Sequence, residues 1–176
     1  MKIVFISNFY NHHQQPISEN LYELTGGEYR FIAVEDVPDE RKILGYTESR
    51  APFLMKSSDE EAKSWITDAD VVISGFVGEE LLAERKRRKK LILRYSERPL
   101  KNGFEWKKYP YRWFKWRKIA PRGVPVYLLC AGAYVASDYA AFGLFRGKAM
   151  KWGYFPESPR YDVHSLIKHK NKREIL

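Results

Sequence analysis

Two adjacent histidines and a glutamine, His12, His13 and Gln14, follow the first apolar run of the chain. Their imidazole and amide groups donate and accept hydrogen bonds, so a ligand-binding role competes with a plain solvated turn, and the residues alone leave both open. Neighbouring histidines do not share one helix face, as the i, i+4 histidines of many zinc sites do, and we expect no metal here. The glycine-rich patterns of conventional NAD and ATP sites are absent from this segment.

A second polar group, Glu97, Arg98 and Lys101, follows the apolar stretch LILRY. Glu97 is isolated among cations, which should keep its carboxyl group ionised and able to orient hydroxyl groups or act as a base. The alternative is an ordinary ion pair with Arg94 or Arg98. Gly75 begins a third candidate loop, Gly75-Phe-Val-Gly78, ahead of a predicted helix. Backbone amides at the start of a helix can bind an anion, although two glycines are a weak signal.

Large aromatic residues alternate with cations in the segment WKKYPYRWFKWRK, which covers residues 106–118. On a helix, Trp113 and Trp116 share one face with Tyr109, so half of this helix is a candidate for the core. The same composition is typical of a helix that lies on an anionic bilayer, and it also suits single-stranded nucleic acid. We favour the membrane surface, with a patch formed by Lys107, Lys108, Trp113, Lys115, Trp116 and Lys118.

Charge is segregated along the chain. The 176 residues include 31 Lys and Arg against 22 Asp and Glu, for a net charge of +9. Residues 57–84 carry one basic and eight acidic side chains, whereas residues 85–122 carry sixteen basic and two acidic ones, a net charge of +14. We expect a block this cationic to face a negatively charged partner.

Length and composition exclude several classes of protein. A chain of 176 residues with 44% hydrophobic content is expected to form one folded domain rather than a disordered segment. The longest apolar stretch, Val124–Ala136, is too short to cross a bilayer, and the N-terminus turns polar too early for a signal peptide, which predicts a cytoplasmic protein. One cysteine and four scattered histidines argue against disulfide and structural zinc scaffolds.

Strand and helix patterns alternate along the chain. Strands are predicted over residues 2–7, 29–34, 70–74, 91–95, 124–129 and 149–153, and residues 36–56 have no clear pattern. Helices are predicted over residues 16–24, 58–67, 78–89, 109–119 and 132–142, and a capping box of Ser58 and Glu61 starts the second. This order predicts a doubly wound α/β fold, with a Rossmann-like, mostly parallel sheet and helices on both faces. The candidate loops then share the carboxyl edge of the sheet.

Four segments together resemble the N-terminal half of a GT-B glycosyltransferase, of the bacterial family 4 type found in surface-polysaccharide synthesis: MKIVFISNFYNHHQQPISENLYE, DVVISGF, LILRYSERPLK and KWGYFPE. The resemblance implies a Rossmann-like acceptor-binding domain over residues 1–156. Residues 157–176 are then expected to be a linker and the start of a missing C-terminal domain that binds the nucleotide sugar, with Lys172–Leu176 similar to its first strand. Many members have a glycine-rich loop where this chain has His12, His13 and Gln14.

The resemblance also implies a function. Such enzymes transfer a hexose from a nucleotide-sugar donor to a sugar or lipid-linked acceptor, without a metal or a tightly bound cofactor, at the cytoplasmic face of the membrane. This chain alone is expected to be inactive, because the glutamates that hold the donor belong to the second domain. The expected contacts in the cleft are His12, His13, Gln14, Gly75, Glu97, Arg98 and Lys101. A basic module for single-stranded nucleic acid remains the rival from another class.

Overall fold

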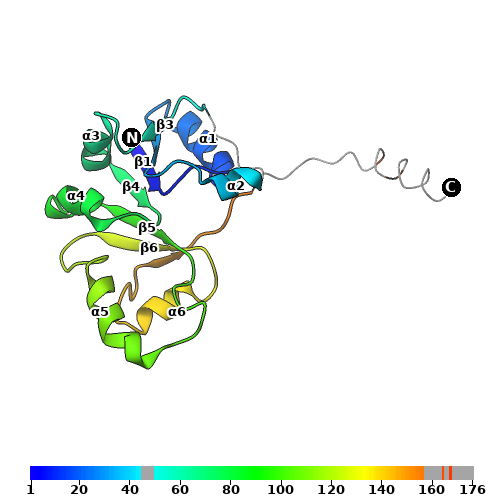
Figure 1. Cartoon of the computed structure of the whole chain (residues 1–176). Coiled ribbons are helices and arrows are strands. Elements are labelled where there is room, and N and C mark those ends of the chain that lie inside the picture. The colour runs from blue at the N-terminus through cyan, green and yellow to red at the C-terminus, as the bar shows by residue number, and fades with distance from the viewer. Residues whose placement is uncertain (45–49, 157–163, 165–166, 168–176) are drawn as a thin grey trace, which may run out of the picture.

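A single parallel sheet forms the centre of the computed structural model, which describes residues 1–44, 50–156, 164 and 167 (Figure 1). Within these residues the sheet has seven strands in the order β3-β2-β1-β4-β5-β6-β7, and every neighbouring pair is parallel. The strands are β1 (Ile3–Ser7), β2 (Tyr29–Ala33), β3 (Leu54–Lys56), β4 (Val71–Ser74), β5 (Ile92–Ser96), β6 (Val126–Cys130) and β7 (Ala149–Lys151). The predicted α/β fold with a Rossmann-like sheet is confirmed, and the sheet is parallel throughout.

Helices connect the strands and pack on both faces of the sheet. They are α1 (Gln15–Leu24), α2 (Asp39–Ile43), α3 (Ala62–Asp68), α4 (Ala83–Arg87), α5 (Tyr109–Arg117) and α6 (Val135–Ala140), with 3₁₀ turns η1 (Glu79–Leu82) and η2 (Trp106–Lys108). Alternate strand residues enter two separate cores, as the period of two in a strand requires. Val4 and Ile6 join the core that contains residues of α3, η1, α5 and α6, whereas Ile3 and Phe5 join the core beside α1.

Several predicted boundaries are wrong in detail. The predicted capping box does not form, because α3 begins at Ala62 after Glu61, which makes no side-chain cap bond. The preceding residues form a turn in which Asp59 accepts a hydrogen bond of 2.7 Å from the amide of Lys56. The helix predicted over residues 78–89 is divided into η1 and α4. Residues 36–56, which had no clear pattern, contain α2 and β3.

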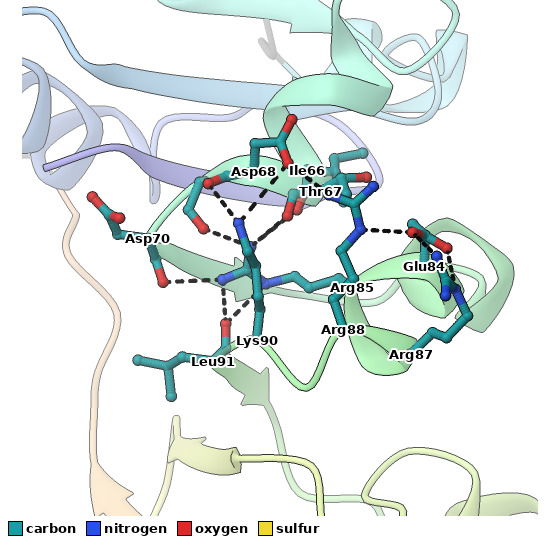
Figure 2. A network of polar contacts seen from close by, with 11 residues as sticks. Ile66, Thr67, Asp68, Asp70, Glu84, Arg85, Arg87, Arg88, Lys90 and Leu91 are labelled. Atoms are coloured by element: carbon teal, nitrogen blue, oxygen red, sulfur yellow. Dashed lines mark hydrogen bonds and ion pairs between the residues drawn. The ribbon is translucent and has the colours of Figure 1, made fainter.

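Arg85 anchors the edge of the sheet opposite the candidate loops (Figure 2). It is fully buried, and its guanidinium donates hydrogen bonds to main-chain oxygens at the end of α3 and at the starts of β4 and β5. The acceptors are the carbonyl groups of Ile66, Thr67, Ala69, Asp70 and Leu91, at 2.6 to 3.4 Å. Burial lowers the pKa of Arg85 to about 10, which still leaves it charged at neutral pH. A cation therefore satisfies carbonyl groups that the end of a helix leaves without partners.

Two predictions concern the end of the chain. The strand predicted over residues 172–176 lies outside the described residues. The linker predicted over residues 157–176 also lies outside them, apart from positions 164 and 167.

Candidate functional site

The strand order reverses between β1 and β4, and two candidate loops leave the sheet at this point. In a doubly wound sheet, the connections on either side of such a switch point diverge and leave a crevice beyond the carboxyl ends of the strands. Gly75 lets the two strands approach closely there: its amide donates to the carbonyl of Ile6 at 2.8 Å, and a Cβ atom would lie 2.6 Å from Oγ of Ser7. The structure therefore assigns Gly75 a steric role, and contact with a ligand remains a prediction.

The loop after β1 is held by its own polar groups. Asn11 accepts a hydrogen bond from the amide of His13 at 2.9 Å, and Oε1 of Gln14 accepts one from the amide of Asn11 at 3.1 Å. The rings of His12 and His13 lie 4.0 Å apart. Gln14 thus closes the turn, and the two imidazoles are presented side by side ahead of α1.

His13 is the histidine that the fold brings to other candidate groups. Its ring lies 5.8 Å from that of Tyr154, which follows β7. Partial burial and the neighbouring His12 lower the pKa of His13, while the negative charge of Glu97 acts in the opposite direction. Among the described residues, Nδ1 of His13 is buried and has no hydrogen-bond partner. Because Nδ1 is buried, a hydroxyl group can meet this imidazole only through its other ring nitrogen, Nε2.

Glu97 completes a cluster with Lys101, Tyr154 and Tyr95. Its carboxylate pairs with the ammonium of Lys101 and hydrogen-bonds to the phenol of Tyr154, and both contacts lower the pKa of Glu97. Burial and the same bond to Glu97 raise the pKa of Tyr154, and burial raises that of Tyr95, which hydrogen-bonds to Tyr154. The alternative interpretation, an ion pair of Glu97 with Arg94 or Arg98, named the wrong partner, because the observed pair is with Lys101. Loops after β1, β5 and β7 thus bring together His13, Glu97, Lys101 and Tyr154.

Arg98 has a different environment. Its Nε pairs with the carboxylate of Asp138 in α6 at 3.0 Å, and its guanidinium lies 4.9 Å from the ring centre of Tyr134. The same carboxylate accepts a hydrogen bond from the amide of Leu100 at 3.1 Å. Arg98 therefore holds the loop after β5 against α6. The sequence had suggested a common site for Arg98 and Glu97 because the two residues are adjacent in the chain. A role for Arg98 in ligand binding remains a prediction.

Sequence reasoning missed Tyr95, Tyr154 and Phe76 as candidates. The signal for Tyr154 was its position directly after the last predicted strand, and Tyr95 ends the predicted strand before Glu97. Phe76, beside Gly75, is 89% exposed in the loop after β4. An exposed aromatic ring at the carboxyl edge of a parallel sheet is a surface on which a sugar or a base can stack.

The expected membrane patch differs from the structure in its aromatic members. Trp113 and Trp116 lie half-buried against the core, and the ring of Trp116 is 4.4 Å from Phe142 in the loop after α6. The prediction from helical spacing, that Trp113 and Trp116 face the core, therefore describes these two residues better than the prediction of a membrane patch. The patch lysines lie on the exposed surface: Lys107, Lys108, Lys115 and Lys118. Their partner remains a prediction.

Among the described residues, no group of three or more His, Cys, Asp or Glu side chains is placed to hold a metal ion. In the same part of the chain, no helix has the length and apolar character needed to span a bilayer. The sequence matches no protein-family model and no curated protein.

Proposed function

We propose that this chain is the acceptor-binding domain of a GT-B glycosyltransferase that uses a nucleotide-sugar donor. The observation that carries the proposal is the convergence of His13, Glu97 and Tyr154 from three loops at the carboxyl edge of a parallel sheet. A site made of an imidazole, a carboxylate and a phenol suits a polyhydroxylated ligand. The resemblance of the four sequence segments to the N-terminal half of such enzymes supports the same function.

Each residue of the site has a role in this proposal. Glu97 accepts hydrogen bonds from acceptor hydroxyl groups, and Lys101 holds the carboxylate in place while keeping it ionised. The imidazole of His13 receives a further hydroxyl, and partial burial together with His12 lowers the pKa of His13, which favours the neutral form. The loop after β1 has no glycine-rich phosphate site. In this proposal the nucleotide-sugar donor is therefore held by a second domain.

The first experiment measures sugar binding by this chain. Amide and imidazole NMR signals are followed while mono- and disaccharides are added one at a time, and at least one sugar is expected to shift His13 and Tyr154. Glu97→Gln should weaken that binding at least about tenfold, because the ligand loses a charge-assisted hydrogen bond. Glu84→Gln, at the opposite edge of the sheet, is the control. Failure of every sugar to shift these signals would overturn the proposed acceptor site.

The second experiment measures transfer. The longest product of the gene is incubated with uridine, guanosine and thymidine diphosphate hexoses and with lipid-linked or soluble sugar acceptors, and residues 1–176 are assayed beside it. Transfer by a longer product, but not by residues 1–176, is the expected result. A reading frame that ends at residue 176 would remove the two-domain enzyme from consideration.

A further inference from the structure

Four aromatic side chains project from the segment that connects β5 to α5 and from the outer face of α5. Trp106 is 73% exposed, Tyr111 66% and Phe114 67%, and Phe104 is also exposed. Figure 1 shows this green segment at the lower end of the molecule, away from β3 and α1. Single exposed aromatic residues are normal on a surface, but several in one short segment mark a place where a partner binds.

Exposed lysines accompany these rings. The ammonium of Lys107 lies 5.8 Å from the ring centre of Trp106, and that of Lys115 lies 5.8 Å from the ring centre of Tyr111. Within the described part of the chain, neither lysine forms an ion pair with a carboxylate. Lys107 and Lys115 therefore lie beside exposed aromatic rings on one surface. The positive charge of these two lysines remains for a partner to neutralise.

The opposite face of α5 packs against the core. Trp116 packs against Tyr139 and Phe142, with ring centres 5.4 and 4.4 Å apart, so the helix is held in place by one set of rings while another set stays outside. Among the described residues, the ring of Phe104 lies 6.0 Å from that of Phe142 in the core, whereas Trp106, Tyr111 and Phe114 have no ring contact with a buried residue. The last three rings are therefore not needed for the core. Removing them should leave the fold intact.

We propose that residues 104–115 dock this protein on the surface of an anionic bilayer. The aromatic rings enter the boundary between headgroups and acyl chains, and the lysines bind lipid phosphate groups. The positive charge suits either anionic partner, but the projecting position of the rings favours a bilayer over single-stranded nucleic acid, which is bound in a groove that follows its backbone. This inference rests on the surface alone and holds whether or not the chain is part of a glycosyltransferase.

Vesicle flotation tests the proposal with the whole chain. The protein is expected to float with vesicles of equal parts phosphatidylcholine and phosphatidylglycerol and to stay behind with phosphatidylcholine alone. The triple variant Lys107→Glu, Lys108→Glu, Lys115→Glu should lose at least about tenfold in binding, since each cation near the surface contributes roughly 1 kcal/mol, or about fivefold. A matched variant, Lys63→Glu, Lys89→Glu, Lys151→Glu, makes the same change in net charge at other exposed positions and should keep most of the binding.

A second variant tests the aromatic contribution at constant charge. Trp106→Ala with Phe114→Ala should keep its melting temperature and lose most of its binding to anionic vesicles. Equal loss in the matched lysine variant would overturn the proposal, since net charge alone would then explain the binding. Preference for oligothymidine over vesicles, with a steep dependence on salt, would instead identify this surface as a nucleic-acid site. Sugar binding measured with a soluble acceptor is unaffected by either outcome, so the two proposals fail separately.

Discussion

Residues 85–94 and residues 101–122 are both rich in Lys and Arg, yet the fold treats their charges in opposite ways. In the first segment most of the cations have partners: Arg85 bonds to carbonyl groups, Arg88 pairs with Glu84 and Asp68, and Arg94 pairs with Glu79. The acidic partners come from residues 57–84, the most acidic part of the chain. In the second segment most cations are exposed. Lys101 pairs with Glu97, and Lys108 and Arg112 both pair with Glu105.

This difference corrects the expectation drawn from net charge. A charge of +14 over residues 85–122 suggested that the whole block faces an anionic partner, but the first part of it neutralises the preceding acidic segment within the domain. Only the second part is left for an external partner. The lesson is that charge along a sequence identifies a binding surface only after the pairs formed by the fold are removed.

The largest expected effect comes from Arg85→Leu. Loss of the guanidinium leaves several buried carbonyl groups without donors, and each such group costs about 1 to 3 kcal/mol. We therefore expect the free energy of unfolding in urea to fall by about 3 kcal/mol or more. Arg122→Leu, at an exposed position in the second segment, should change it by less than about 0.5 kcal/mol. Similar losses in both variants would contradict the distinction between the segments.

The two faces of α5 give the next comparison. Trp116→Ala should cost about 2 to 4 kcal/mol, because its ring packs against Tyr139 and Phe142 in the core. Phe114→Ala should cost less than about 0.5 kcal/mol, because this ring is exposed. Thermal and urea unfolding of both variants measure the difference. A costly Phe114→Ala would show that the exposed ring serves the fold rather than a partner.

The ion pairs of Glu79 and Glu84 differ in how deeply the arginine partner is buried. The side chain of Arg94 is mostly buried and lies 2.8 Å from Glu79, which also pairs with Lys86. Glu79→Ala should therefore lower the free energy of unfolding by about 1 to 2 kcal/mol, because it leaves a buried cation without its carboxylate. Glu84→Ala removes pairs with exposed arginines and should lower it by less than Glu79→Ala does, because water screens those pairs. Equal values would mean that burial of the pair does not matter.

The smallest effect is the titration of Glu84. Hydrogen bonds from Arg87 and Arg88 lower the pKa of its carboxyl group to about 2, from an ordinary value of 4.5. Because the pKa is lower in the folded state, the stabilisation is complete above pH 4.5 and is lost as the pH falls through about 2. Carboxyl NMR signals should titrate accordingly, and the double variant Arg87→Gln, Arg88→Gln should return the midpoint toward 4.5. An unchanged midpoint in that variant would exclude the two arginines as the cause.

Local sequence patterns predicted most of the secondary structure for a physical reason. The continuous apolar runs of β1, β4 and β6 can be buried only in a sheet covered on both faces, and Pro16 with Gly26 and Gly27 marks the two ends of α1. The capping box at Ser58 failed because Asp59 bonds to the amide of Lys56 and forms a turn ahead of α3. A pattern of four residues does not reveal which competing local hydrogen bond wins.

The candidate site was predicted only in part. The loop after β1 and the strand end at Glu97 were identified because the carboxyl edge of a parallel sheet gathers loops from distant parts of the chain. The contact of Tyr154 with His13 and Glu97 depends on the course of the segment after β7, which no local pattern encodes. The separation of Arg98 from this cluster depends in the same way on Asp138, which lies forty residues further along the chain.

The sequence by itself determined the fold class, the order of the strands and helices other than α2 and β3, and the presence of an unusually cationic and aromatic segment, because these follow from composition and from periods of two and 3.6 residues. Only the tertiary structure decided which charges are neutralised inside the domain, which tryptophans face the core, and which side chains meet beyond the sheet. Those outcomes depend on contacts between residues far apart in the chain, and such contacts arise only once the sheet has brought its strands side by side.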